Sequence, residues 1–325
     1  MQLVIGIDGG GTKTAAVILD SSGRVLGIGE GGPSTFGVVP LEVTHESISA
    51  AARAAALASG LPLSSCGAAF VGLGNVVADA DREAVRRIAA DLGLAPYNRI
   101  GVDHDCRIAL SGGLSGRPGI VLIAGTGTSC FGLNPAGAGW RSGGWGPLID
   151  DEGSSYWLGI QAMGAAVREF DGRGESTLLT QRVVDTLDLN DMNELMNRLY
   201  ASGMTRTEIA ALAPLVYSAA AQGDQAAQNL IRRGSAAMAE CVLAVACKLG
   251  FNQGSSELAV SGGLTHAGAA LFAPLSEEVR LRLPGCRVMP AELSPVLGAG
   301  ILALQSMGIA LEPKILENIR QTSQI

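Results

Sequence analysis

The segment Val4–Leu19, VIGIDGGGTKTAAVIL, decides the fold of this chain. Two short apolar runs, 3–8 and 15–19, flank a turn of glycines and threonine, which predicts two strands joined by a tight hairpin. A turn at 20–23 and a third strand at 24–29 extend this to an antiparallel meander. Helix and strand patterns then alternate between residue 42 and a helix expected from about 105, which implies parallel pairing and an α/β fold.

The same layout returns in the second half of the chain. Val121–Leu133, VLIAGTGTSCFGL, again reads as strand, Gly/Thr hairpin and strand. This similarity favours duplication of a mixed α/β domain, and two unrelated hairpins are the alternative. A helical stretch at 156–227 interrupts the second half, a strand at 257–260 follows, and an apolar helix at 295–306 precedes a polar tail.

Composition limits the classes of protein. A length of 325 residues suggests about two domains, and 47% hydrophobic against 16% charged residues excludes a disordered chain. The net charge is −7 without any basic run, so we expect no nucleic-acid partner. The sequence has no stretch of about 18 uninterrupted apolar residues, so we expect no membrane partner. It also has no signal-peptide pattern, so we expect a cytoplasmic protein. Six cysteines without a C-x-x-C pair read as free, buried thiols.

The two Gly/Thr turns suit phosphate. Glycine lets successive backbone N–H groups point at one anion, and threonine adds hydroxyl donors. Asp8, directly before the first turn, can hold Mg²⁺ or its waters. The P-loop fingerprint is missed because Thr12 separates Gly11 from Lys13, and G-x-G-x-x-G is missed at Cys130. Each turn alone is explained as a hairpin, but the pair together with Asp8 favours a nucleotide site.

Four motifs in one order carry a resemblance. GIDGGGTKT at 6–14, GTGTS at 125–129, GGWGPLIDDEGS at 143–154 and SGGL at 261–264 resemble the N-acetylglucosamine kinase family, within the BadF/BcrA-type ATPases of the actin-like sugar-kinase superfamily. SPVLGAGILAL at 294–304 resembles that family's closing helix.

The resemblance implies two ribonuclease-H-like lobes with a central cleft. We expect an N-terminal lobe of residues 1–117, joined by the tail 305–325, and a C-terminal lobe of residues 118–304. It further implies a homodimer that uses ATP and Mg²⁺ to phosphorylate the 6-hydroxyl of an amino sugar, N-acetylglucosamine or glucosamine, or of a related hexose.

The resemblance also implies roles for single residues. Asp105 matches the catalytic base, which would accept the proton of the attacking hydroxyl, and Asp8 the Mg²⁺-linked aspartate. The nucleotide positions are Gly10, Gly11, Thr12, Lys13, Thr14, Thr126, Gly127, Thr128, Gly262 and Gly263. The sugar positions are Ser34, Thr35, Phe36, Asp105, Ser129, Gly144, Trp145 and Asp151.

Several positions have competing interpretations. Asp105 could cap the helix it begins, and Asp103 is the competing base. His104 invites a metal interpretation, but no other histidine stands at ligand spacing. Phe36 and Ser129 stand where the family usually carries asparagine, so we expect weaker discrimination in favour of N-acetylglucosamine.

Two other functions remain open at this stage. A redox activator of the same ATPase family would need exposed, clustered cysteines for an iron–sulfur cluster, and Cys241 and Cys247 lie in an apolar helix. A non-catalytic sugar or nucleotide sensor is the second alternative, against which Asp8 and Asp105 argue.

Overall fold

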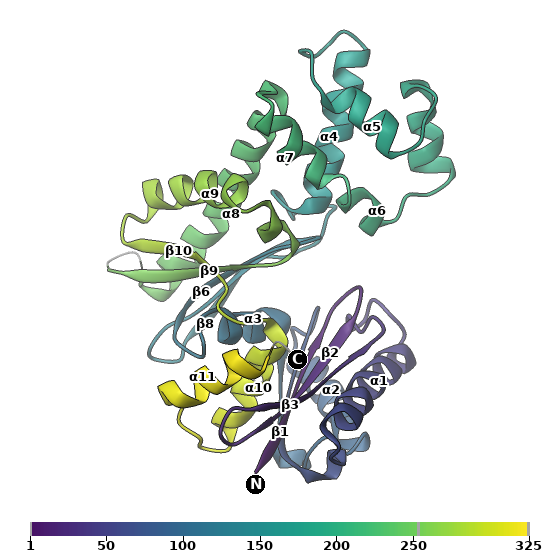
Figure 1. The fold of residues 1–325 in the computed structure, drawn as a ribbon. Coiled ribbons are helices and arrows are strands. Elements are labelled where there is room, and N and C mark those ends of the chain that lie inside the picture. Colours follow the sequence, from purple (N-terminus) through teal and green to yellow (C-terminus); the bar gives the residue numbers. More distant parts are fainter. Residues whose placement is uncertain (1, 252–253, 324–325) are drawn as a thin grey trace. The chain divides into compact units, whose positions relative to one another are not determined.

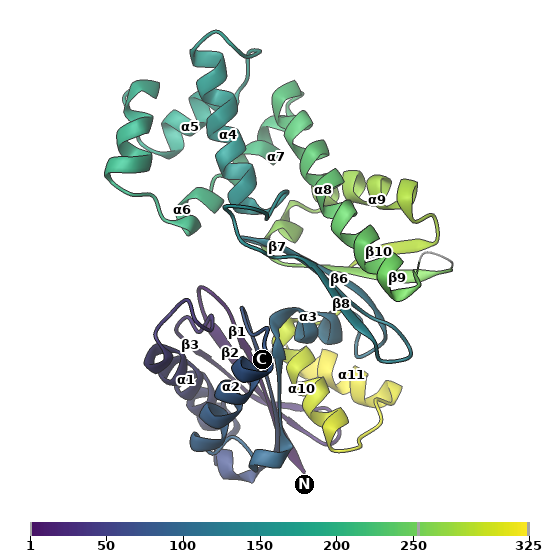
Figure 2. The same cartoon turned by 180° about the vertical axis from the view of Figure 1, so that it is seen from behind.

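A computed structural model describes residues 2–251 and 254–323 of the chain. The chain divides into two compact units (Figures 1 and 2). The first contains residues 1–118 and 291–325, and the second contains residues 119–290. Each unit is built on one five-stranded sheet with helices packed against it.

The first unit has the strand order β3-β2-β1-β4-β5. Strands β1 to β3 pair antiparallel, as the meander predicts, and β1, β4 and β5 pair parallel. Its elements are β1 (Leu3–Gly9), β2 (Thr14–Asp20), β3 (Val25–Gly31), α1 (Leu41–Ser59), β4 (Cys66–Leu73), α2 (Asp79–Asp91), β5 (Ile100–His104), α3 (Asp105–Gly113), α10 (Pro295–Ser306) and α11 (Pro313–Thr322).

Alternation along β1 explains how this sheet is covered on both faces. Ile5 and Ile7 are buried in the core formed with α1 and α2, whereas Val4 is buried in the core formed with α10 and α11. Successive side chains of a strand point to opposite faces, so one apolar run fills both cores. Figures 1 and 2 show α1 and α10 on opposite sides of the sheet.

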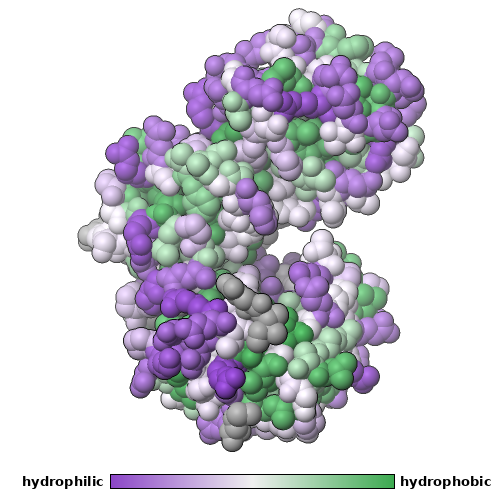
Figure 3. Space-filling model, viewed as in Figure 1, coloured by the Kyte–Doolittle hydropathy of each residue, from purple (hydrophilic) through white to green (hydrophobic). Residues whose placement is uncertain are grey.

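Helix α10 packs in the first unit, although we expected residues up to 304 in the C-terminal lobe. A glycine explains the close approach: a Cβ on Gly6 would lie 2.3 Å from the backbone nitrogen of Gly300. The helix therefore rests on the backbone of β1. The polar tail contains α11, which packs through Ile319, and hydrophilic side chains lie over this helix in Figure 3.

The second unit repeats the topology of the first. Its order is β10-β9-β6-β7-β8, with β6 to β8 antiparallel and β6, β9 and β10 parallel, which confirms that the two halves share one mixed α/β layout. Its strands are β6 (Gly119–Ala124), β7 (Thr128–Leu133), β8 (Gly139–Gly143), β9 (Ser256–Ser261) and β10 (Cys286–Pro290). The sequence analysis missed β8 and β10, which are short edge strands with mostly half-exposed or exposed residues and hence no clear apolar alternation.

The helices of the second unit include the predicted interruption. They are α4 (Ser155–Phe170), α5 (Leu179–Thr186), α6 (Arg206–Ala210), α7 (Ala213–Ala221), α8 (Gln225–Leu249) and α9 (Ala269–Arg282). In both ribbon views α4 to α7 gather at one end of this unit, while α8 and α9 cover the sheet. Within the described ranges, no helix combines the length and the apolar character needed to cross a membrane.

Candidate functional site

In the first unit, three parallel strands end side by side at one edge of the sheet. Gly9 pairs with Leu73 in β4, and Leu73 pairs with His104 in β5. The residues that follow, among them Gly74 and Asp105, therefore cluster at the carboxyl edge, where open α/β sheets bind ligands. A Cβ on Gly74 would lie 3.6 Å from Oδ2 of Asp105. The topology thus brings together residues that lie far apart in the sequence.

Asp8 is the penultimate residue of β1 and carries a strongly perturbed carboxyl group. Burial, and then the charge of Asp105, raises the pKa of Asp8 to about 7, while Lys13 opposes the shift. Lys13 itself forms an ion pair with Glu30 of β3. Two carboxylates close enough to repel each other, while Lys13 is paired with Glu30, form a donor set that suits a divalent cation.

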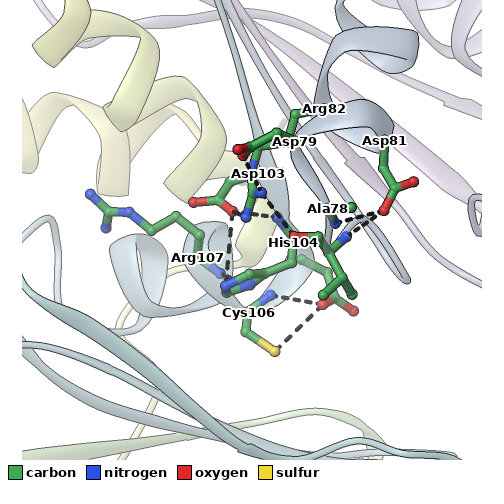
Figure 4. Close-up of polar contacts among 10 residues, drawn as sticks. Ala78, Asp79, Asp81, Arg82, Asp103, His104, Cys106 and Arg107 are labelled. Carbon is green, nitrogen blue, oxygen red and sulfur yellow. Dashed lines mark hydrogen bonds and ion pairs between the residues drawn. The ribbon is translucent and has the colours of Figure 1, made fainter.

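The two candidate bases have different partners, and Figure 4 shows those of Asp103. Oδ1 of Asp103 accepts hydrogen bonds from Nη2 of Arg82 at 3.2 Å and from the His104 amide at 2.9 Å. Oδ1 of Asp105 accepts from the Cys106 amide at 2.8 Å. Asp103 is thus held by a cation, while Oδ2 of Asp105 lies beside Gly74 at the sheet edge.

Helix α3 is capped by His104, not by Asp105. Nδ1 of His104 accepts from the amide of Arg107 at 3.2 Å (Figure 4). Asp105 is the first helical residue. Helix capping was the alternative role for Asp105, and His104 fills that role instead. His104, Asp105 and Cys106 place possible ligand atoms within 4.8 Å of one another, but Nδ1 of His104 is already used by the cap.

The first Gly/Thr turn is tied to residues 32–36 by buried hydroxyl groups. Oγ1 of Thr14 donates to the carbonyl of Gly32 and lies 2.7 Å from Oγ of Ser34, and both side chains are fully buried. Thr12 is exposed, and a Cβ on Gly11 would lie 3.7 Å from Oγ1 of Thr35. Thr14 and Ser34 therefore shape the turn, while Gly11 and Thr12 form its accessible part.

Phe36 is a partly buried residue packed against the α1/α2 core. Its amide donates to the carbonyl of Gly74 at 3.0 Å, and its carbonyl accepts from Nδ2 of Asn75 at 2.8 Å. Asn75 has a positive φ of 67° and is the second residue after the end of β4. The sequence analysis missed this residue, although the Gly-Asn pair after an apolar strand is a turn signal.

The second unit builds a matching edge where β6 and β9 end. The amide of Gly125 donates to the carbonyl of Gly127 at 3.0 Å, which closes the second Gly/Thr turn. Gly262 follows β9 with φ 103°, and a Cβ there would lie 2.5 Å from the carbonyl oxygen of Ala124. Gly262 is thus required where the turn after β9 closely approaches the second Gly/Thr turn. Gly263, in the same turn after β9, lies next to Gly125.

Asp151 joins this turn to the helical part of the second unit. It is 3% exposed and has a positive φ of 65°. Oδ1 accepts from the Thr128 amide at 3.2 Å, and Oδ2 accepts from Nη2 of Arg206 at 2.6 Å. Burial raises the pKa of Asp151, and the Thr128 amide and Arg206 oppose this shift. Arg206 was missed by the sequence analysis because it stands 55 residues from Asp151.

Two of the remaining sugar positions, Gly144 and Trp145, lie on the loop after β8, and Ser129 lies in β7. A Cβ on Gly144 would lie 2.8 Å from Oγ of Ser129, so these residues are direct neighbours. Trp145 is 69% exposed, its amide donates to Asp150, and the guanidinium of Arg141 lies 5.3 Å from its ring. Trp145 is thus available for stacking rather than part of the core.

The residues at the sheet edge of each unit fit the ligands expected there, phosphate in the second unit and Mg²⁺ in the first. Oγ1 of Thr128 is buried and accepts or donates no hydrogen bond within the described residues. A buried hydroxyl without a partner costs free energy that a phosphate oxygen would recover. Asp8 and Asp105 supply the oxygen donors that Mg²⁺ prefers.

The cysteines are free thiols in varied environments. Cys66, Cys106 and Cys130 are buried as expected, while Cys247 is exposed on α8. Burial raises the pKa of Cys241, also on α8 and half-buried, which disfavours the thiolate that binds iron.

Two sheets of identical topology, each with a Gly/Thr turn at its first hairpin, define the ribonuclease-H-like, actin-like ATPase fold. The sequence matches the BadF/BadG/BcrA/BcrD ATPase family over residues 5–303, and the chain belongs to this family.

Relatives and solved structures agree with this assignment. The chain is 34% identical over 305 residues to an N-acetylmuramic acid/N-acetylglucosamine kinase of Clostridium acetobutylicum, covering 93% of this chain and 98% of the relative. A solved structure from Chromobacterium violaceum is 29% identical with a TM-score of 0.74, covering 94% and 99% of the two chains. A ROK family glucokinase from Streptomyces griseus shares the fold at 19% identity and a TM-score of 0.59, covering 94% and 99%.

Proposed function

We propose that this protein is an ATP-dependent kinase that phosphorylates the 6-hydroxyl of an amino sugar, N-acetylglucosamine or glucosamine, or of a related hexose. The observation that carries the proposal is the pair of carboxylates at the edge of the first sheet. Asp8 and Asp105 repel each other there, while Asp103 is held by Arg82. The curated relative at 34% identity acts on N-acetylmuramic acid and N-acetylglucosamine, which supports an amino-sugar substrate.

Asp105 acts as the general base in this proposal. Its Oδ2 orients the sugar 6-hydroxyl and accepts its proton as the oxygen attacks the terminal phosphorus of ATP, so that the P–O bond to ADP breaks. Oδ1 keeps its bond to the Cys106 amide, which holds the carboxylate at the start of α3. Thr35, Phe36, Ser129, Gly144 and Trp145 are the proposed sugar-binding positions.

ATP is proposed to bind through both Gly/Thr turns. Gly10, Gly11 and Thr12 offer accessible backbone and hydroxyl groups in the first unit, and Thr126 and Gly127 do so in the second. Thr128 is buried and contributes its hydroxyl, which is unpaired within the described part of the chain. Thr14 and Lys13 act by shaping the first turn, since one is buried and the other is paired with Glu30. Gly262 and Gly263 border the adenosine.

Asp8 is the proposed Mg²⁺ position. When bound, this cation neutralises charge on the phosphates. Asp8 contributes a buried carboxylate whose ionised form is disfavoured without a counter-cation. We also propose a homodimer in the cytoplasm, where ATP is available; light scattering tests the dimer, since a monomer at working concentration contradicts it.

The test is a coupled ADP-release assay on N-acetylglucosamine, N-acetylmuramic acid, glucosamine and glucose, with Asp105→Asn as the decisive variant. We expect wild-type turnover on at least one amino sugar and a loss of about 100-fold or more in kcat for the variant, since the proton acceptor is gone. Folding and ATP binding remain nearly unchanged because Asn keeps the side-chain shape.

Asp103→Asn is the matched control. It removes the ion pair with Arg82 and should change kcat by less than about fivefold. Full turnover by Asp105→Asn together with loss of turnover in Asp103→Asn would assign the base to Asp103 instead.

A further inference from the structure

Arg206 is a cation placed directly against the second Gly/Thr turn. A Cβ on Gly127 would lie 2.7 Å from Nη2 of Arg206 and 2.9 Å from Oδ2 of Asp151. A side chain at position 127 would therefore displace the guanidinium or the carboxylate from the turn. Arg206 begins α6, in the helical part of the second unit. The positive charge beside the second Gly/Thr turn therefore comes from a helix and not from the sheet.

The position of this guanidinium is set by Asp151. Asp151 is almost fully buried and bonds to the Thr128 amide through its other oxygen, so it cannot turn away without losing that contact. One carboxylate thus links the turn and the arginine. An ion pair keeps its geometry better when its carboxylate is buried and held by a second hydrogen bond than when both side chains are mobile on the surface.

Most of the donors of Arg206 remain available. Its side chain is 46% exposed, and within residues 2–251 and 254–323 its only hydrogen bond or ion pair is the one to Asp151. A guanidinium has five N–H donors in a planar fork that matches phosphate oxygens. Nε and Nη1 are therefore free to bind an anion at the turn whose Thr128 hydroxyl also lacks a partner.

We infer that Arg206 binds the terminal phosphate of ATP, held in place for this task by Asp151. The inference rests on the proposed function, because it takes the second Gly/Thr turn as a phosphate site. Asp151 is then a positioning residue rather than a direct contact to the sugar. A fixed guanidinium beside the transferring phosphoryl group stabilises the charge that spreads over its oxygens.

The test compares two nucleotides on Arg206→Gln, Arg206→Lys and wild type. Calorimetric titration with Mg²⁺ measures the Kd of ADP and of a non-hydrolysable ATP analogue. For Arg206→Gln we expect the analogue to bind about 10-fold or more weakly and ADP within about twofold, since only the analogue carries the terminal phosphate. Arg206→Lys should restore part of the loss because it keeps the charge but not the fork.

Arg198→Gln is the matched control. Arg198 also lies in the helical part and pairs with a carboxylate, Glu208, and its removal should leave both Kd values unchanged. Thermal unfolding checks that each variant folds.

Equal weakening of both nucleotides would show a structural role and overturn the inference, as would unchanged affinity for both. A loss confined to the KM of N-acetylmuramic acid would assign Arg206 to that sugar's carboxylate, and this also overturns it. If wild type phosphorylates no sugar, the proposed function fails, while the nucleotide comparison still decides the role of Arg206.

Discussion

Glu292 joins the two points at which the chain passes between its units, and replacing it should weaken the first unit in a pH-dependent way. Its carboxylate pairs with Arg117 at 2.6 Å and with Arg320 of α11 at 2.8 Å, and it accepts from Oγ of Ser115 at 2.6 Å. Residues 117 and 292 each lie within two positions of a unit boundary. The network thus holds both crossings and α11 together within the first unit.

The size of the effect follows from the pKa. Burial would raise the pKa of Glu292, but hydrogen bonds from Arg117, Ser115 and Arg320 outweigh it and lower the pKa from 4.5 to about 2. This difference in the pKa of Glu292 between the unfolded and the folded chain corresponds to a contribution of at most about 3.4 kcal/mol to the free energy of unfolding. Because the side chains of Arg117 and Arg320 are 42% and 47% exposed, solvent screening reduces this, and we expect about 2 kcal/mol.

The sign of the pH dependence is fixed by the lowered pKa. The stabilisation is complete above about pH 4.5, where the unfolded carboxyl is also ionised, and it is lost as the pH falls toward 2. Glu292→Gln should therefore lower the free energy of unfolding by about 2 kcal/mol at neutral pH. At about pH 3 the difference from wild type should fall to less than half of that value.

Urea unfolding followed by far-UV circular dichroism measures this difference. Trp140, Trp145 and Trp157 all lie in the second unit, so tryptophan fluorescence reports that unit separately in the same samples. Glu278→Gln, which removes a single i,i+4 pair with Arg282 on α9, is the control and should change stability by less than about 0.5 kcal/mol. An equal loss at both pH values, or no loss at neutral pH, would refute the electrostatic account of Glu292.

Two other substitutions test the sites directly. Gly262→Ala puts a Cβ 2.5 Å from the carbonyl oxygen of Ala124 at φ 103°, so it should destabilise the second unit by more than about 2 kcal/mol; a thermal midpoint equal to that of wild type would contradict this. Phe36→Asn should shift selectivity toward N-acetylglucosamine by supplying an amide, at some loss of packing against the core. The ratio of kcat/KM for N-acetylglucosamine, glucosamine and glucose measures it, and high wild-type selectivity for N-acetylglucosamine would argue against it.

Local sequence signals were sufficient for the strands and turns of both hairpins. Short apolar runs at 3–8 and 120–124, bounded by Gly/Thr turns, predict β1 and β6, because strand burial and turn conformation depend on neighbouring residues. The family motifs pointed to Asp8 and Asp105 for the same reason, since each stands at a recognisable strand end.

Residue pairs distant along the chain were decided by packing. The edge strands β8 and β10 depend on pairing with β7 and β9, and α10 joins the first unit because Gly6 lets it rest on the backbone of β1. Asp151 pairs with Arg206 across 55 residues. Such contacts cost loop-closure entropy that only tertiary burial offsets, so no local pattern of residues encodes them.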